Sequence, residues 1–213
     1  PMLPVLYSFR RCPYAMRARM TLIYSSINPE LREVLLKDKP SSMLAISAKG
    51  TVPVLQLPDS NVLDQSRDIM HWALAINDPQ QWLDEEIATS ISELIDYNDN
   101  QFKTHLDHYK YWERFPAESK NFYRTQGESF LQRLEQQLNN QRYLLADTIS
   151  MADIALFPFI RQFAFVDKSW FDQAPYPKLQ AWLQELLDSR LFLAAMKKLP
   201  PWHEGDSPVS LYQ

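Results

Sequence analysis

Patterns typical of β-strands occur only near the start of this chain, and that restriction limits the folds open to it. Runs rich in β-branched and aromatic residues predict strands at 5–9, 31–36, 52–57 and 62–63. No convincing strand pattern follows in the rest of the 213 residues. The sequence therefore predicts a small α/β unit followed by an all-helical part.

Helical segments separate and follow the predicted strands. Apolar side chains recur at helical spacing from Met16 to Ile27, and Pro29 stops the pattern. A short helix or turn is predicted at 40–47, and a longer helix at 66–75. The predicted order of elements in the first unit is thus β-α-β-α-β-β-α.

A linker is predicted at 77–84, where the sequence NDPQQWLD begins with the helix breaker Asn-Asp-Pro. Beyond it, residues 151–164 are apolar nearly all round, as in a helix buried inside a domain. Ser150 and Asp153 match a capping box at the start of that helix. The predicted organisation is an α/β domain at 1–76, the linker, and an all-helical domain at 85–213.

Composition argues against several classes of protein. The chain is 46% hydrophobic and can build a packed core, while its net charge of −4 argues against nucleic acid as the main partner. No apolar stretch approaches the ~18 residues of a membrane span, and no signal peptide is visible. The single cysteine excludes an internal disulfide framework and a cysteine-only zinc site, and it fits a reducing cytoplasm.

That cysteine, Cys12, lies in the stretch YSFRRCPYAMR, where the first predicted strand passes into a helix. Pro13 suits the first helical turn, so Cys12 is predicted at the N-cap or the adjoining position. The orphan N–H groups of a helix start and the neighbouring arginines favour a thiolate. Without a second cysteine, such a nucleophile implies a monothiol, mixed-disulfide mechanism that uses an external thiol. The alternative is a small, buried hydrophobic side chain.

Two further motifs suggest a ligand site. In KGTVPVLQL, Pro53 lies within a strand pattern although proline cannot donate to a sheet. A cis peptide bond there would leave the Val52 N–H and C=O free to pair with an extended ligand, and a strand that merely starts with proline is the alternative. In LDQSRD, Ser66 can cap the following helix, or Gln65 and Ser66 can hold a ligand carboxylate at the helix start.

These three motifs in this order, followed by helices, resemble the cytosolic glutathione transferase superfamily. The likeness is greatest to its cysteine-type members, the omega-like transferases and two-domain glutaredoxins. It is carried by SFRRCPYAMRARM, LLKDKP, KGTVPVLQL, LDQSRDIMHWAL and ISMADIALFPF, and it spans nearly the whole chain. The resemblance implies a thioredoxin-like N-terminal domain, an all-helical C-terminal domain that contributes a second-substrate site, and a homodimer.

The resemblance also implies roles for single residues. Cys12 takes the place of the catalytic thiol, and Lys39 would reach the glycine carboxylate of glutathione. Val52, which precedes Pro53, would pair with the cysteinyl backbone of glutathione.

The γ-glutamyl end of glutathione is assigned by the resemblance to Gln65 and Ser66. The family usually has Glu at the first of these positions, so Gln65 is a departure. A neutral amide lacks the charge that would pair with the γ-glutamyl ammonium group. Ser66 still offers a hydroxyl to the carboxylate.

Tyr7 gives a rival assignment, because tyrosine-type transferases activate glutathione with a hydroxyl on the first strand. Cys12 is preferred because it lies where the helix begins, which leaves Tyr7 in the core or the pocket wall. By family position, Tyr7, His105, Tyr109 and Trp112 are assigned to the second-substrate pocket. A metal site at His105 and His108 is not expected, since no acidic or thiol partner lies at ligand spacing.

The chain is therefore interpreted as a cytoplasmic, glutathione-dependent thiol transferase or reductase that forms a mixed disulfide at Cys12. Glutathione is the cosubstrate, and the second substrate is a mixed disulfide, dehydroascorbate or another small organic compound. No metal, nucleic acid or membrane partner is expected. Two alternatives remain open: a non-catalytic binding or regulatory protein of the same fold, and glutathione conjugation that depends on Tyr7.

Overall fold

The computed structural model describes residues 3–213, which form two compact units. One unit runs to Gln80 and also contains Ser189–Gln213, and the other is Gln81–Asp188. The predicted domains differ from this division because they place 189–213 with the helical domain. That segment groups with the first unit because Leu211 is buried among the side chains of the sheet and its helices.

The first unit is built on a four-stranded sheet in the order β2-β1-β3-β4. The pair β1 and β2 is parallel, while β1 with β3 and β3 with β4 are antiparallel. This order of α/β elements is thioredoxin-like, as the sequence predicts. The strands are β1 (Val5–Ser8), β2 (Glu30–Glu33), β3 (Val54–Gln56) and β4 (Val62–Leu63).

Three strands are shorter than predicted, and the one expected at 5–9 ends at Ser8. The strand expected at 31–36 ends at Glu33, since its partner β1 ends opposite at Ser8 and the chain then turns between Leu35 and Asp38. The strand expected at 52–57 starts at Val54, because the preceding proline has no N–H to donate.

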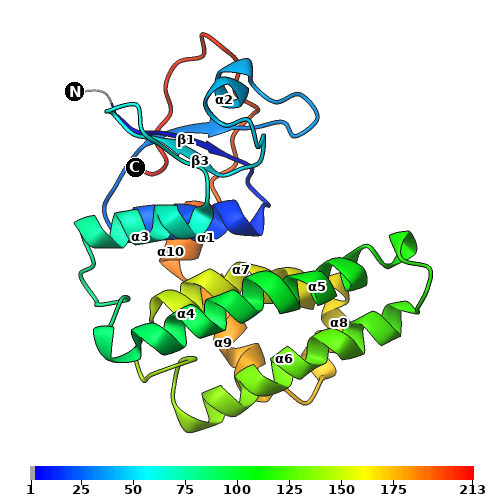
Figure 1. Ribbon diagram of the computed structural model, residues 1–213. Helices are drawn as coiled ribbons and strands as arrows, with labels where there is room; N and C mark the ends of the chain where they lie inside the picture. Colours follow the sequence, from blue (N-terminus) through cyan, green and yellow to red (C-terminus); the bar gives the residue numbers. More distant parts are fainter. Residues whose placement is uncertain (1–2) are drawn as a thin grey trace. The chain divides into compact units, whose positions relative to one another are not determined.

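Helices cover both faces of this sheet (Figure 1). On one face, Leu6 and Leu55 pack with apolar residues of two helices, while on the other face Tyr7 and Val54 pack with Met43 of the short helix α2. Successive residues of β1 thus point to opposite cores. The helices of this unit are α1 (Pro13–Tyr24), α2 (Ser41–Ile46), α3 (Ser66–Ile76) and α10 (Arg190–Ala195).

The segment after α10 runs along the outer edge of β2. Backbone hydrogen bonds join Trp202 N–H to the Glu33 carbonyl (2.7 Å) and Leu31 N–H to the Val209 carbonyl (2.7 Å). The Leu211 N–H donates to Pro29 at 3.0 Å. The edge strand of the sheet is therefore paired rather than open.

The second unit is all-helical, as predicted. Helix α7 is buried along most of its length, which matches its nearly continuous apolar sequence. Gly127 allows α6 to approach α7, since a Cβ at this position would lie 2.4 Å from the Phe163 ring. The elements are η1 (Glu85–Ile87), α4 (Ala88–Tyr97), η2 (Asn98–Phe102), α5 (Lys103–Lys110), η3 (Trp112–Arg114), α6 (Lys120–Asn140), α7 (Met151–Val166), α8 (Lys168–Gln173) and α9 (Pro177–Leu187).

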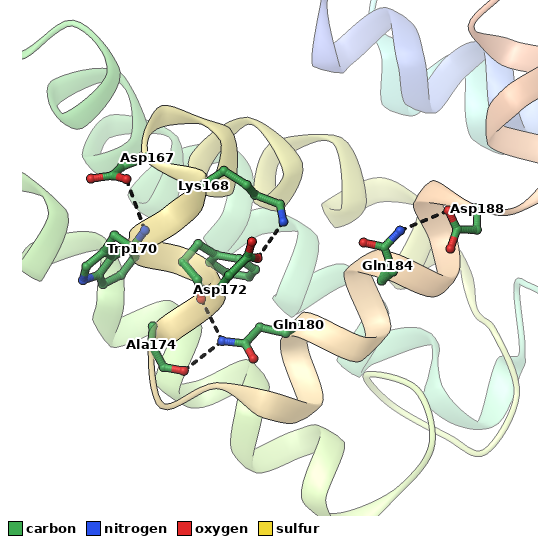
Figure 2. A network of polar contacts seen from close by, with 9 residues as sticks. Asp167, Lys168, Trp170, Asp172, Ala174, Gln180, Gln184 and Asp188 are labelled. Atoms are coloured by element: carbon green, nitrogen blue, oxygen red, sulfur yellow. Dashed lines mark hydrogen bonds and ion pairs between the residues drawn. The ribbon is translucent and has the colours of Figure 1, made fainter.

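The predicted capping box at the start of α7 is confirmed. The Asp153 carboxylate accepts the Ser150 N–H at 2.9 Å, and the Ser150 hydroxyl accepts the Ala152 N–H at 3.2 Å. Further along the chain, Figure 2 shows the start of α8, where the Asp167 carboxylate accepts the Trp170 N–H, and the contact between α9 and the end of α8, where the Gln180 amide donates to the Ala174 carbonyl. These local bonds satisfy backbone groups that a helix end leaves without partners.

Candidate functional site

A cavity of about 580 Å³ lies in the first unit. It brings together the residues that the sequence assigned to the catalytic thiol and to glutathione, although they come from four separate segments. Its lining consists of Cys12, Tyr14, Leu36, Lys39, Lys49, Gly50, Thr51, Val52, Pro53, Asp64, Gln65 and Ser66.

Cys12 occupies the N-cap of α1, with Pro13 as the first helical residue. This is the position that the Cys-Pro sequence predicted. The Cys12 side chain is half-buried and free of any disulfide, and it makes no hydrogen bond to the helix backbone as a cap. The N-cap position places Cys12 beside the first N–H groups of α1 and the positive end of the helix dipole, which favour negative charge on its sulfur.

The cis peptide bond predicted before Pro53 is present, between Val52 and Pro53. The Val52 carbonyl lies 3.8 Å from the Cys12 sulfur. Among the described residues, no backbone carbonyl accepts the Val52 N–H. The N–H of Val52 thus remains available to an extended molecule that enters the cavity beside the thiol.

Ser66 lines the cavity from α3. The prediction that Ser66 caps this helix is wrong, because Gln65 is the N-cap and Ser66 is the first helical residue. The Ser66 side chain is buried, and its hydroxyl accepts the Arg17 Nε–H at 3.0 Å. The exposed side chain of Gln65 makes no cap hydrogen bond.

Charged side chains at the cavity are mostly cationic. Lys39 and Lys49 are exposed, and Lys49 Nζ donates to the Asp64 backbone carbonyl at 2.6 Å. The Asp64 carboxylate accepts the Ser47 hydroxyl at 3.1 Å. Gly50 turns the chain between these groups with a φ of +67°, a left-handed conformation that disfavours any other residue. An anionic ligand would meet two lysines here.

Tyr7 does not line this cavity, although the sequence placed it in the second-substrate pocket. Its ring is 1% exposed and packs against Val54 and Met43. Its hydroxyl donates to the Ser42 hydroxyl at 2.8 Å and accepts from Arg32 at 2.7 Å. Tyr7 therefore belongs to the core, the other location that the sequence analysis allowed.

The other three residues assigned to a second-substrate pocket belong to the second unit. Tyr109 is fully buried in α5, and burial raises its pKa. His105 is half-buried on the same helix, and burial together with the charge of His108 lowers its pKa. Trp112 is exposed on η3. Their assignment to a substrate pocket stays a prediction.

Several lining residues were not picked out from the sequence. Lys49, Gly50 and Thr51 precede the Val-Pro pair directly, and Asp64 precedes Gln65. Their positions next to predicted residues were the only signal available. Leu36 was assigned to a strand, and it lines the cavity because that strand ends three residues earlier.

Residues 3–213 lack two other kinds of feature. No group of three or more His, Cys, Asp or Glu side chains is placed to hold a metal ion. None of the helices formed by these residues has the length and apolar character needed to cross a membrane.

A thioredoxin-like domain with a cysteine-containing cavity, joined to an all-helical unit, defines the class of protein. Residues 6–82 match the glutathione S-transferase N-terminal domain family, and residues 80–185 match the glutathione S-transferase C-terminal domain family. The chain thus belongs to the glutathione S-transferase superfamily.

The chain is also similar to individual proteins, either in sequence over part of its length or in fold. Glutaredoxin 2 of Escherichia coli K12 is 37% identical over 67 residues, which are 32% of this chain and 31% of that protein. The fold is similar to glutathione transferase Omega 3C from Trametes versicolor (TM-score 0.76, 21% identity, 91% of this chain and 88% of that one). It is also similar to BphK, a bacterial glutathione transferase, in a ternary complex (TM-score 0.73, 25% identity, 90% and 97%). The curated relative therefore matches over only about a third of its length.

Proposed function

We propose that this chain is a glutathione-dependent thiol transferase and reductase that forms a mixed disulfide at Cys12. One observation carries the proposal: the sulfur lies at the N-cap of a helix, in a cavity, 3.8 Å from the carbonyl of Val52. The partial match to a glutaredoxin supports reduction over conjugation as the main reaction.

The proposed reaction has two thiol–disulfide exchanges. The Cys12 thiolate attacks the glutathione sulfur of a mixed disulfide R–S–S–G, which forms Cys12–S–S–G and releases R–S⁻, which takes up a proton. The thiolate of a second glutathione then attacks the glutathionyl sulfur and releases Cys12 and oxidised glutathione. The sum is R–S–S–G + GSH → RSH + GSSG, so glutathione is the reductant. The chain has only one cysteine, which fits this monothiol route.

The cavity offers a partner for each part of glutathione. Val52 would pair with the cysteinyl backbone, which brings the glutathione sulfur toward Cys12. Lys39 would take the glycine carboxylate, and no carboxylate of the described residues forms an ion pair with it. Ser66 and Gln65 would take the γ-glutamyl end at the N-terminus of α3, an 11-residue helix.

Burial of the Tyr7 hydroxyl in the core weighs against the rival conjugation mechanism. Small disulfides and dehydroascorbate are the proposed second substrates, and a homodimer is the expected assembly from the family. A cytoplasmic location fits a chain with a single cysteine.

The test is a Cys12→Ser variant assayed with a glutathionylated small thiol and reduced glutathione. Formation of oxidised glutathione should fall to the uncatalysed rate, and mass spectrometry should detect a single glutathione adduct on the wild-type chain but none on the variant. Full reductase activity in Cys12→Ser would overturn the proposal. Loss of conjugating activity in Tyr7→Phe, with Cys12→Ser unaffected, would favour the rival mechanism instead.

A further inference from the structure

Helix α1 carries two arginines that are almost completely buried, Arg17 (1% exposed) and Arg19 (2% exposed). Burial of a guanidinium is costly unless hydrogen bonds and opposite charges compensate it. The two side chains have different partners, although only one residue separates them. Their arrangement suggests different roles beside the cavity.

Arg19 forms hydrogen bonds with the end of β1 and with the loop between β1 and α1. Its Nη1 donates to the Ser8 hydroxyl (2.7 Å) and to the Phe9 carbonyl (3.1 Å), and its Nη2 donates to the Arg10 carbonyl (2.6 Å). The Phe9 carbonyl also accepts the Cys12 N–H at 3.1 Å. A single carbonyl oxygen thus links the Arg19 guanidinium to the backbone of Cys12.

The Arg19 guanidinium also reaches the C-terminal part of the unit. Arg19 Nε donates to the Ala195 carbonyl at 2.8 Å, at the end of α10. Arg10 adds a parallel bond from its Nε to the Met196 carbonyl at 2.9 Å. The loop that carries Cys12 is therefore fastened to a segment more than 180 positions later in the chain.

Electrostatic interactions also couple Arg19 and Cys12. Burial lowers the pKa of Arg19 to about 10, while the charges of Glu33 and Cys12 act in the opposite direction and that of Arg10 adds to the lowering. The coupling is mutual, so a charged Arg19 favours an ionised Cys12. The other charged groups that line the cavity with Cys12 are Lys39, Lys49 and Asp64.

Arg17 is directed to the part of the cavity wall that α3 contributes. Its Nε donates to the Ser66 hydroxyl, and its guanidinium lies 5.3 Å from the centre of the Tyr14 ring, which also lines the cavity. Arg17 therefore supports the part of the cavity wall at the N-terminus of α3.

We propose that Arg19 is a positioning residue that fixes the Cys12 loop and maintains a positive charge near its sulfur, while Arg17 supports the ligand end of the cavity at Ser66. This division of roles rests on the proposed function for its meaning in catalysis. The reactivity of the thiol itself can be measured without glutathione, which separates the two proposals.

The test compares Arg19→Met with Arg17→Met, a matched loss of one buried cation from the same helix. Alkylation of Cys12 by iodoacetamide is followed as a function of pH, and glutathione affinity is measured by calorimetry on the Cys12→Ser background. For Arg19→Met the alkylation profile should move to higher pH, with the rate at neutral pH about tenfold lower. For Arg17→Met the profile should stay in place while glutathione binding weakens.

Circular dichroism checks that the variants are folded. A second variant, Arg19→Lys, keeps the positive charge but cannot form all the hydrogen bonds of the guanidinium group. Its alkylation profile should lie between those of the wild type and Arg19→Met. A folded Arg19→Met or Arg19→Lys protein with the wild-type profile would overturn the proposal. Equal shifts in Arg17→Met and Arg19→Met would also overturn it. If the alkylation profile shifted only in the Arg19 variants, and the wild-type protein had no reductase activity, this inference would stand and the proposed function would be refuted.

Discussion

Gln65 is the residue at which the cavity departs from the family pattern, and its surroundings explain what a charge there would do. The side chain is exposed at the N-cap of α3 and makes no cap hydrogen bond. The positive end of a helix dipole favours a carboxylate at this position. Neighbouring Asp64 and Asp68 partly oppose it.

A Gln65→Glu variant should bind glutathione more tightly, because a carboxylate there would pair with the γ-glutamyl ammonium. An exposed ion pair of this kind contributes less than about 1 kcal/mol, so the dissociation constant should fall by about two- to fivefold. Calorimetry at low and high salt checks this, since screening should remove most of the gain. An unchanged affinity at low salt would mean that the γ-glutamyl end does not lie at Gln65.

Glu33 is a second residue whose environment has a measurable consequence. Burial raises its pKa above 4.5, against the opposing effects of the Arg10 N–H bond and the charges of Arg19 and Arg10. The folded state therefore keeps this proton to higher pH than the unfolded state. The cost of ionising Glu33 is absent below pH 4.5, develops between pH 4.5 and the raised value, and is fully present above it.

The variant Glu33→Gln should remove that pH dependence while its amide oxygen still accepts the Arg10 N–H. Relative to the wild type, its free energy of unfolding should be similar below pH 4.5 and higher at neutral pH. Urea unfolding at the two pH values measures the difference. A gap between the proteins that narrows as pH rises would contradict the assigned direction.

At the scale of elements, helix α7 depends on Asp153 far more than an ordinary cap would suggest. The carboxylate is fully buried and accepts three N–H groups, from Ser150 (2.9 Å), Leu144 (3.0 Å) and the Trp182 indole (3.0 Å). It therefore joins the helix start to the preceding loop and to α9. Asp167 caps α8 in a simpler way, with one bond to the Trp170 N–H (Figure 2).

Asp153→Ala should destabilise the protein by more than about 3 kcal/mol, because three buried N–H groups would lose their acceptor. Asp167→Ala is the matched control and should cost about 1 kcal/mol, as expected for a single N-cap. Urea unfolding of both variants gives the comparison. If both variants lost the same free energy of unfolding, the three bonds of Asp153 would contribute no more than the single cap bond of Asp167.

At the scale of the whole molecule, local motifs predicted more than long-range contacts did. The strand-to-helix position of Cys12, the cis bond at Pro53 and the capping box all follow from neighbouring residues, and all three are confirmed. The apolar stripe of α1 left Arg17 and Arg19 on its other faces. They are buried because α3 and α10 both pack against α1, and periodicity within one helix cannot reveal how many neighbours it has.

The C-terminal segment shows the same limit, since nothing in its proline-rich composition indicated that it completes the sheet. Trp202, Val209 and Leu211 all take part in backbone bonds to β2 or to the residue before it. Leu211 is 1% exposed in the core beneath the sheet, whereas the Val209 side chain is 37% exposed. An unpaired edge strand is a template for association with another chain, so this segment has a protective role as well.

Leu211→Ala should therefore lower the free energy of unfolding by about 2 kcal/mol or more through the cavity it leaves. Val209→Ala changes the same segment at an exposed side chain and should cost less than about 0.5 kcal/mol. Urea unfolding measures both variants, and light scattering under mild destabilisation should show faster association for Leu211→Ala, because loosening the segment uncovers β2. If both variants behaved like the wild type, the segment would contribute neither to the core nor to the protection of the edge.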